Sequence, residues 1–167
     1  FEFTLTLLSE VVGLLVEIRE HGARMTGTMK APFLSDSPLT ALNGVFNLFI
    51  ADPSDPERKR MQYSAQLESR EGRKFYFEGF KEVYNNKGVD VWKDTTTLFI
   101  SLFEGDSSIN RLIGKGKLHI EISDFMKQLK TIKAINAPSR NKEFKAISTF
   151  GKFFAGNVYN TYFKKLK

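Results

Sequence analysis

The stretch KFYFEGFKEVYNNKGVDVWKDTTTLFISLF, residues 74–103, decides the fold. It contains two runs rich in aromatic and β-branched residues, Lys74 to Tyr84 and Thr95 to Phe103, and such runs favour β-strands. The connection between them includes Asn85-Asn86-Lys87-Gly88, which is typical of a turn. We therefore predict a β-hairpin with a long connection.

The second run of this hairpin has apolar residues on both faces. Leu98, Ile100 and Leu102 alternate with Phe99 and Phe103, so the two sets point to opposite sides of a strand. A strand with two apolar faces buries surface on both sides. We expect it inside a sheet and not at an edge.

Length and composition are consistent with a single domain over residues 1–167, a length at which a hydrophobic core needs no disulfide or metal. The chain has no Cys, which excludes thiol catalysis and thiolate metal sites and agrees with a reducing compartment. No apolar run approaches the roughly 20 residues of a membrane-spanning helix. We expect a cytoplasmic location. Because the chain begins with Phe1 and FTLTL follows directly, we also expect it to be part of a longer polypeptide.

The net charge of +6 is confined to the last segment of the chain. Residues 139–167 contain seven basic residues and one acidic residue, and residues 1–138 contain 18 of each. The electrostatic argument for an anionic partner therefore applies to the tail and not to the body. The neutral body argues against nucleic-acid binding.

Alternating segments elsewhere predict further strands. They lie at Phe1–Leu7, Arg24–Ala31, Val45–Ala51, Met61–Leu67, Leu112–Ile122 and Leu129–Asn136. With the hairpin this makes about eight short strands, which indicate a mainly β fold, an antiparallel meander forming a barrel or a sandwich.

Two helices and one loop complete the expected fold. Ser9 is a plausible cap for a short N-terminal helix that stops near Gly22. Pro32–Asn43 indicates a loop that closes at Asn43-Gly44. Residues 139–167 predict a basic, aromatic C-terminal helix.

Few residues suggest catalysis or metal binding. His21 and His119 lack a second ligand at metal spacing, and Gly114–His119 resembles a dinucleotide loop but lies within a predicted strand. Four aspartates in or near loops could bind calcium, but interspersed basic residues and prolines favour solvated turns. They are Asp52, Asp55, Asp90 and Asp94. We predict no catalytic residue, no metal and no cofactor.

Aromatic residues suggest two binding hypotheses. The chain has 16 Phe, and a barrel of about eight strands can enclose one small apolar ligand. Its candidate lining is Phe46, Phe75, Phe77, Trp92, Phe99 and Phe103, although Trp92 also suits a plug at one end of the barrel. The tail could instead contact a membrane or a partner through Lys145, Lys152, Phe150 and Phe154, or pack its apolar face on the sheet.

Several runs together resemble one family. They are MTGTMKAP (Met25–Pro32), NGVFNLFIADP (Asn43–Pro53), KRMQY (Lys59–Tyr63), FYFEGFKEV (Phe75–Val83), DVWKDTTTLF (Asp90–Phe99), GKGKLHI with SDFMKQL (Gly114–Leu129) and FGKFFAGNVYNTYF (Phe150–Phe163). They resemble the segment that follows the flavoprotein part of long bacterial glucose-methanol-choline oxidoreductases of the cholesterol-oxidase-like type. The flavin and hydrolase motifs of such proteins have no counterpart in this chain.

The resemblance implies an accessory domain of a sterol- or lipid-active protein, with neighbouring domains of the same polypeptide as partners. Our leading hypothesis is a non-catalytic module that binds an apolar ligand, such as a lipid or sterol, or positions those domains. The alternative is a peripheral membrane module that acts through the tail. An independent barrel enzyme ranks third, because no acid–base pair can be named.

Overall fold

The computed structural model describes residues 2–52, 55–83 and 96–162. The strands are β1 (Glu2–Leu8), β2 (Gly22–Lys30), β3 (Leu39–Asp52), β4 (Asp55–Glu68), β5 (Lys74–Val83), β6 (Thr97–Glu104) and β7 (Leu112–His119). The helices are α1 (Val12–Glu17), α3 (Ile122–Leu129) and α4 (Arg140–Tyr162).

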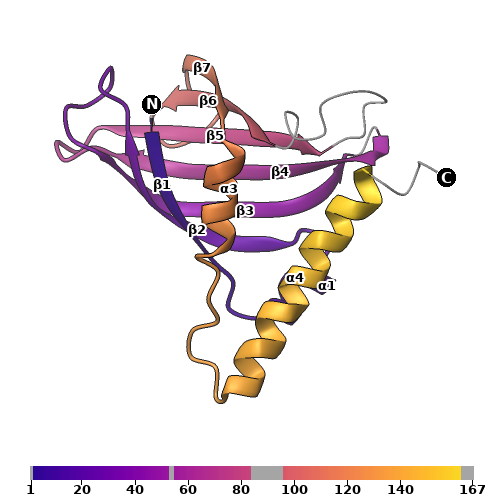
Figure 1. Cartoon of the computed structure of the whole chain (residues 1–167). Helices are drawn as coiled ribbons and strands as arrows, with labels where there is room; N and C mark the ends of the chain where they lie inside the picture. Colours follow the sequence, from indigo (N-terminus) through magenta and orange to yellow (C-terminus); the bar gives the residue numbers. More distant parts are fainter. Residues whose placement is uncertain (1, 53–54, 84–95, 163–167) are drawn as a thin grey trace.

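Within the described residues, the seven strands form one sheet in the order β1 to β7. Every strand is antiparallel to the next, so the predicted mainly β meander is confirmed. The sheet curves strongly, but its edge strands β1 and β7 do not pair with each other (Figure 1). The prediction of a closed barrel is therefore wrong, and the fold is an open curved sheet.

The predicted hairpin is the β5–β6 pair, in register from Phe75 opposite Glu104 to Phe80 opposite Phe99. Strand β6 lies between β5 and β7, so the prediction that it is an inner strand is confirmed. Most of the connection, residues 84–95, lies outside the described residues.

The predicted eighth strand at Leu129–Asn136 is absent from the described residues, because Leu129 ends α3 and no strand follows it. The acidic Asp124 in the first turn of α3 favours the helix dipole, and Lys127 bonds to it at 2.7 Å between Nζ and Oδ1. These local interactions favour the helix, and the weak alternation after it does not form a strand within the described residues.

The predicted turn at Asn43-Gly44 is instead a bulge within β3, which begins at Leu39. Asn43 has a positive φ of 50°. A Cβ at Gly44 would lie 2.3 Å from the backbone oxygen of Met25 on the neighbouring strand. The glycine thus permits close approach of two backbones, and the bulge bends the sheet.

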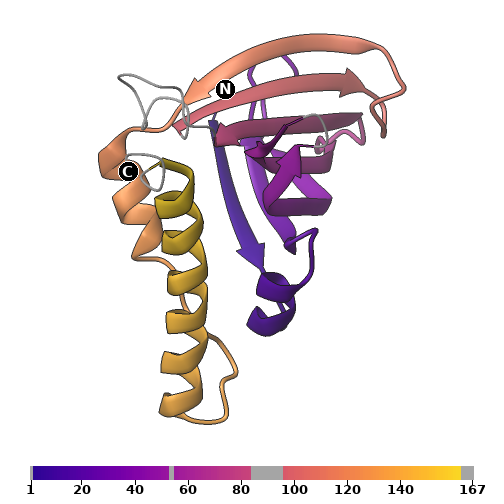
Figure 2. The ribbon, with the colours of Figure 1, turned by 90° about the vertical axis from the view of Figure 1, so that its right-hand side faces the viewer.

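The buried core lies on one face of the sheet, which we call the inner face. It contains residues from β2 through β6 and the β2–β3 connection. They are Met25, Met29, Ala31, Leu39, Ala41, Phe46, Leu48, Phe49, Met61, Ala65, Leu67, Phe75, Phe77, Val83, Leu98 and Leu102. The sheet curves around this face (Figure 2).

A second bulge, between Asn47 and Ile50 of β3, places two successive residues in the core. Leu48 and Phe49 are each 3% exposed, whereas neighbours in a regular strand point to opposite faces. Phe49 has a φ of 57°, a left-handed conformation that is uncommon for a bulky residue. The bulge therefore turns an aromatic side chain toward the inner face.

The predicted C-terminal helix is α4, and its second half packs on the core. The Phe49 ring lies 6.0 Å from that of Phe153 and 5.3 Å from that of Phe154, measured between centroids. Phe150 and Val158 also pack against the core. Helices α3 and α4 lie on the same side of the sheet (Figures 1 and 2).

Candidate functional site

Three of the predicted lining residues lie in the core. Phe46 and Phe75 are each 6% exposed, and Phe77 is fully buried. All three belong to the buried core of the inner face. Trp92 lies outside the described residues.

The other two predicted lining residues point to the outer face. Phe99 stacks on Phe80 with centroids 5.2 Å apart, and the Lys117 ammonium lies 5.2 Å from the Phe99 centroid. The ring centroid of Phe103 lies 6.4 Å from that of Tyr76. The described members of the predicted set are therefore divided between two faces and cannot line one site.

The inner face nevertheless has an apolar strip that is only partly covered. Ile100 of β6 and Leu118 of β7 are half-buried and pack against the core. The inward positions beside them on β7 are Gly114 and Gly116, paired with Leu102 and Ile100. A Cβ at Gly114 would meet no atom within 4 Å, so this part of the inner face has open space.

The opposite edge strand also offers half-buried apolar side chains. Phe3 and Leu5 of β1 pair with Met29 and Gly27 of β2 and pack against the core. Directly opposite residues of an antiparallel pair point to the same face, so Phe3 and Leu5 belong to the inner face. Both edges of the open sheet thus present partly exposed apolar residues on the same face as the core.

The inner face also contains a buried charged residue. Lys81 is 6% exposed and lies opposite Met61 on β4. Its ammonium is 5.9 Å from the centroid of the Tyr63 ring. Burial lowers the pKa of Lys81 from 10.5 to about 8, and burial also raises the pKa of Tyr63. Among the described residues, no carboxylate forms an ion pair with Lys81.

A second inner-face lysine connects the sheet to α4. Lys59 lies opposite Val83 and is therefore a diagonal neighbour of Lys81. Its Nζ donates a hydrogen bond to Oδ1 of Asn157 in α4. Burial lowers the pKa of Lys59. Lys59 thus has a polar partner from the covering helix, whereas the partner of Lys81 within the described part of the chain is an aromatic ring.

Sequence reasoning missed Lys81, although a signal for it exists. In the run FYFEGFKEV, Lys81 has the same parity as Phe75, Phe77, Gly79 and Val83, all of which are buried. Alternation alone therefore places a lysine on the apolar face. Lysines are almost never fully buried without a partner, which makes such a position a candidate functional site.

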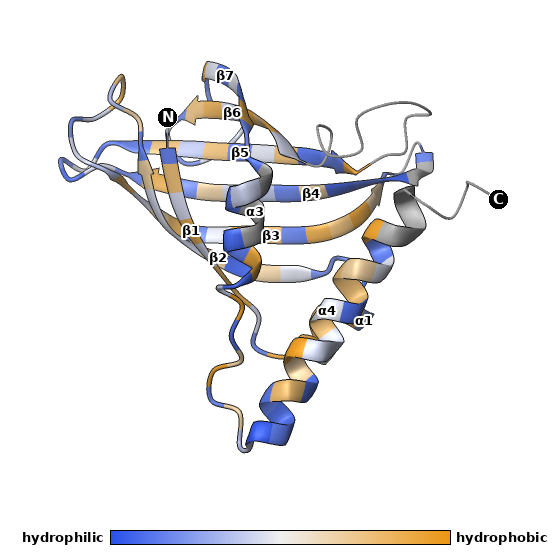
Figure 3. Cartoon of the chain, in the orientation of Figure 1, coloured by the Kyte–Doolittle hydropathy of each residue, from blue (hydrophilic) through white to orange (hydrophobic). Residues whose placement is uncertain are grey.

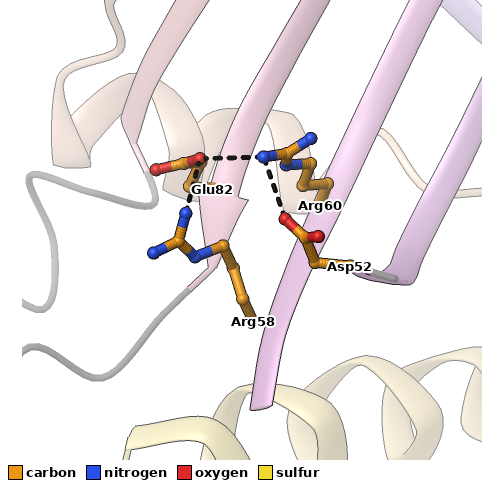
Figure 4. Close-up of polar contacts among 4 residues, drawn as sticks. All are labelled: Asp52, Arg58, Arg60 and Glu82. Atoms are coloured by element: carbon orange, nitrogen blue, oxygen red, sulfur yellow. Dashed lines mark hydrogen bonds and ion pairs between the residues drawn. The ribbon is translucent and has the colours of Figure 1, made fainter. Parts of the chain in front are cut away.

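A separate charged cluster lies at the end of β3, β4 and β5 (Figure 4). Arg60 pairs with Asp52 at 2.9 Å and with Glu82 at 3.4 Å, and Arg58 pairs with Glu82 at 3.6 Å. Each distance joins a guanidinium nitrogen to a carboxylate oxygen. Both carboxylates are paired with arginine, an arrangement that suits structural linkage of three strands better than proton transfer.

The described residues contain no metal site for the calcium hypothesis or for the two histidines. Among the described residues, no group of His, Asp and Glu is arranged to hold a metal ion. His21 Nδ1 lies 2.8 Å from the Leu15 oxygen, and its ring is 4.8 Å from that of Phe153. His119 Nδ1 lies 3.1 Å from Thr97 Oγ1. Asp90 and Asp94 lie outside the described residues.

The predicted contact residues of the tail are divided along α4. Phe150 and Phe154 are half-buried against the core, whereas Lys145 and Lys152 are exposed. Phe144, in the first half of this helix, is 74% exposed. Figure 3 shows hydrophilic residues in the first turn of α4 and apolar residues farther along it. Over the described residues, no helix has both the length and the apolar character to cross a membrane.

Comparisons with protein-family models, with curated proteins and with solved structures give no match to this chain.

Proposed function

We propose that this chain is a non-catalytic module that binds an apolar ligand on the inner face of its open sheet. The observation that carries the proposal is the partly covered apolar strip beside Gly114, where Ile100 and Leu118 remain half-buried. Binding of an apolar ligand would remove this surface from water, which favours binding by about 25 cal/mol per Å² of apolar area buried.

The arrangement of α4 supports the same proposal. Its aromatic residues cover the part of the inner face near Phe49 and pack there against the core. Ile100 and Leu118, on β6 and β7, belong to the part of the sheet farthest along the strand order from β1. A ligand seated against them would extend the core without displacing α4.

The biological setting remains the one that the sequence resemblance implies. We propose an accessory domain of a cytoplasmic, sterol- or lipid-active protein of the glucose-methanol-choline oxidoreductase type, with neighbouring domains of the same polypeptide as partners. Positioning those domains is compatible with ligand binding, because the outer face stays available.

Native mass spectrometry tests ligand binding most simply. The purified chain is measured as isolated and after incubation with cholesterol, oleate or oleyl alcohol. We expect a bound species with at least one of these ligands. A protein that takes up none of them contradicts the proposal.

A matched pair of variants tests the location. Gly114→Leu adds an apolar side chain at a position where a Cβ would meet no atom within 4 Å, so we expect it to occupy the strip. Lys115→Leu makes the neighbouring change at an exposed position. We expect Gly114→Leu to weaken binding and Lys115→Leu to leave it unchanged. Equal binding by both variants would place the ligand elsewhere.

A second function, membrane contact through α4, is favoured by the exposed Phe144. This aromatic residue has exposed basic neighbours in Lys142 and Lys145, and aromatic and basic residues together suit an anionic membrane surface. Ile147, one turn farther along, is 37% exposed. The proposed contact is therefore the first half of the helix, because its second half packs on the core.

Point substitutions test this function better than deletion of residues 139–167, which would also remove the part of α4 that packs on the core. We expect Phe144→Ser and Lys145→Glu each to reduce co-sedimentation with phosphatidylserine vesicles. Phe33→Ser is the control, because Phe33 is 69% exposed on the β2–β3 connection. Wild-type protein that does not co-sediment would refute membrane contact.

A further inference from the structure

The proposed ligand-binding face contains a buried cation, Lys81, that forms no ion pair with any carboxylate of the described residues. The side chain of Lys81 is buried, and across the sheet it lies opposite Met61 with Tyr63 and the cationic Lys59 as diagonal neighbours. An ammonium ion removed from water is destabilising unless it is paired. The Tyr63 ring supplies a cation–π interaction, which is weaker than an ion pair with a carboxylate.

The other charged groups that the structure describes in this region do not compensate the charge of Lys81. The Asp52 and Glu82 carboxylates are held by Arg60, and Glu82 alternates with Lys81 along β5, so it points to the outer face. Lys59 on the inner face is itself cationic and bonds to α4. The inner face therefore presents positive charge on an apolar surface.

We propose that the apolar ligand is a monocarboxylate, such as a long-chain fatty acid, whose carboxylate binds the Lys81 ammonium. This inference rests on the proposed function and adds the chemical class of the ligand. A carboxylate fits because a single buried lysine can balance one negative charge. The hydrocarbon part would contact the inner face, where Ile100 and Leu118 are half-buried.

Oleate and oleyl alcohol provide the test, because they share a hydrocarbon chain and differ in the charged head group. Their dissociation constants are measured by isothermal titration calorimetry at pH 7 with the full chain. We expect oleate to bind more tightly by roughly tenfold to a hundredfold, the range of a charge-assisted hydrogen bond.

Variants assign this preference to Lys81. Lys81→Met keeps the length of the side chain and removes the charge, so oleate and oleyl alcohol should bind with equal affinity. Lys81→Gln is a second variant that keeps a polar group, and circular dichroism checks that both are folded. Lys115→Met, at an exposed position of β7, should preserve the preference for oleate.

The outcomes separate the two proposals. Equal affinity of the wild-type protein for both ligands would refute the carboxylate proposal while ligand binding stands. A preference for oleate that persists in both Lys81 variants would also refute it. Failure of the wild-type protein to bind either ligand would overturn the carboxylate proposal and count against the proposed function, which the cholesterol measurement then decides.

Discussion

The ammonium of Lys81 lies 5.9 Å from the centre of the Tyr63 ring, on the face of the sheet that holds the core. Lys81 is a diagonal neighbour of Tyr63 across the β4–β5 pair. Burial makes the charged form of each side chain less favourable, so the pKa of Lys81 falls to about 8 and that of Tyr63 rises. Stability should therefore depend on pH through these two residues.

Substitution of Lys81 by Met should stabilise the protein at pH 7. The substitution removes a desolvated ammonium, and the lowering of the Lys81 pKa from 10.5 to about 8 corresponds to at most about 3 kcal/mol. The free energy of unfolding is measured by urea denaturation. A destabilised Lys81→Met variant would contradict this account of the buried charge.

The wild-type protein should become more stable between pH 8 and about pH 10. In this range the folded state loses the Lys81 proton while the unfolded state keeps it, so the unfolded state binds more protons. Above about pH 10 the raised pKa of Tyr63 reverses the trend, because only the unfolded tyrosine ionises. Lys59 also has a lowered pKa and adds to the rise. Urea denaturation across this range should show a smaller rise in Lys81→Met.

Truncation of Phe49 should weaken both the core and the attachment of α4. Phe49→Ala removes a ring that is 3% exposed and contacts Phe153 and Phe154. We expect a loss of about 3–5 kcal/mol in the free energy of unfolding and faster hydrogen exchange of α4 amides. Phe33→Ala, at a 69% exposed position, should change stability by less than about 0.5 kcal/mol. Equal effects of the two variants would refute the packing role of Phe49.

Gly27→Ala should disrupt the pairing of β1 with β2. A Cβ at this position would lie 2.0 Å from the Thr4 backbone oxygen, and φ is 148°. Thermal unfolding should show a clear decrease in melting temperature. Gly13→Ala in α1 is the control, because its Cβ would meet no atom within 4 Å and alanine favours helices by about 1 kcal/mol. An unchanged melting temperature of Gly27→Ala would contradict the β1–β2 register.

Asp52→Asn should destabilise the end of the β3–β4 hairpin. The Asp52 side chain is 5% exposed and its carboxylate pairs with Arg60, so the substitution leaves that guanidinium with weaker compensation. We expect a loss of about 2 kcal/mol in urea denaturation. Glu104→Gln breaks the exposed pair with Arg111 and should cost less than about 1 kcal/mol. If Asp52→Asn lowered the free energy of unfolding no more than Glu104→Gln does, burial would not strengthen the contribution of the Asp52–Arg60 pair to stability.

Local pattern predicted most of the architecture. The β5–β6 hairpin and the C-terminal helix follow from alternation in Lys74–Phe103 and from the apolar spacing of the tail. Closure of the sheet could not be predicted, because it depends on whether β1 reaches β7 and not on any local pattern. The bulge at Phe49 was also missed, since two consecutive core residues break the alternation on which strand prediction depends. The bulge at Asn43-Gly44 was predicted as a turn.

The candidate site was less predictable than the fold. Aromatic residues were expected to line one interior, but Phe99 points to the outer face with Phe80 while Phe77 lies in the core. Lys81 was missed although alternation in the run Phe75–Val83 places it on the apolar face, because a lysine is more often exposed than buried. Helix α4 leaves part of the inner face only partly covered. The position of that part depends on long-range packing, which sequence periodicity does not predict.

Methyl NMR during titration with oleyl alcohol tests the central claim, that the inner face binds an apolar ligand, most directly. This ligand carries no charge, so the result does not depend on Lys81. We predict chemical-shift changes at the methyl groups of Ile100 and Leu118, with none at Ile109, which is 93% exposed. Shifts confined to Ile147 on α4, or no shifts at any ligand concentration, would contradict the claim.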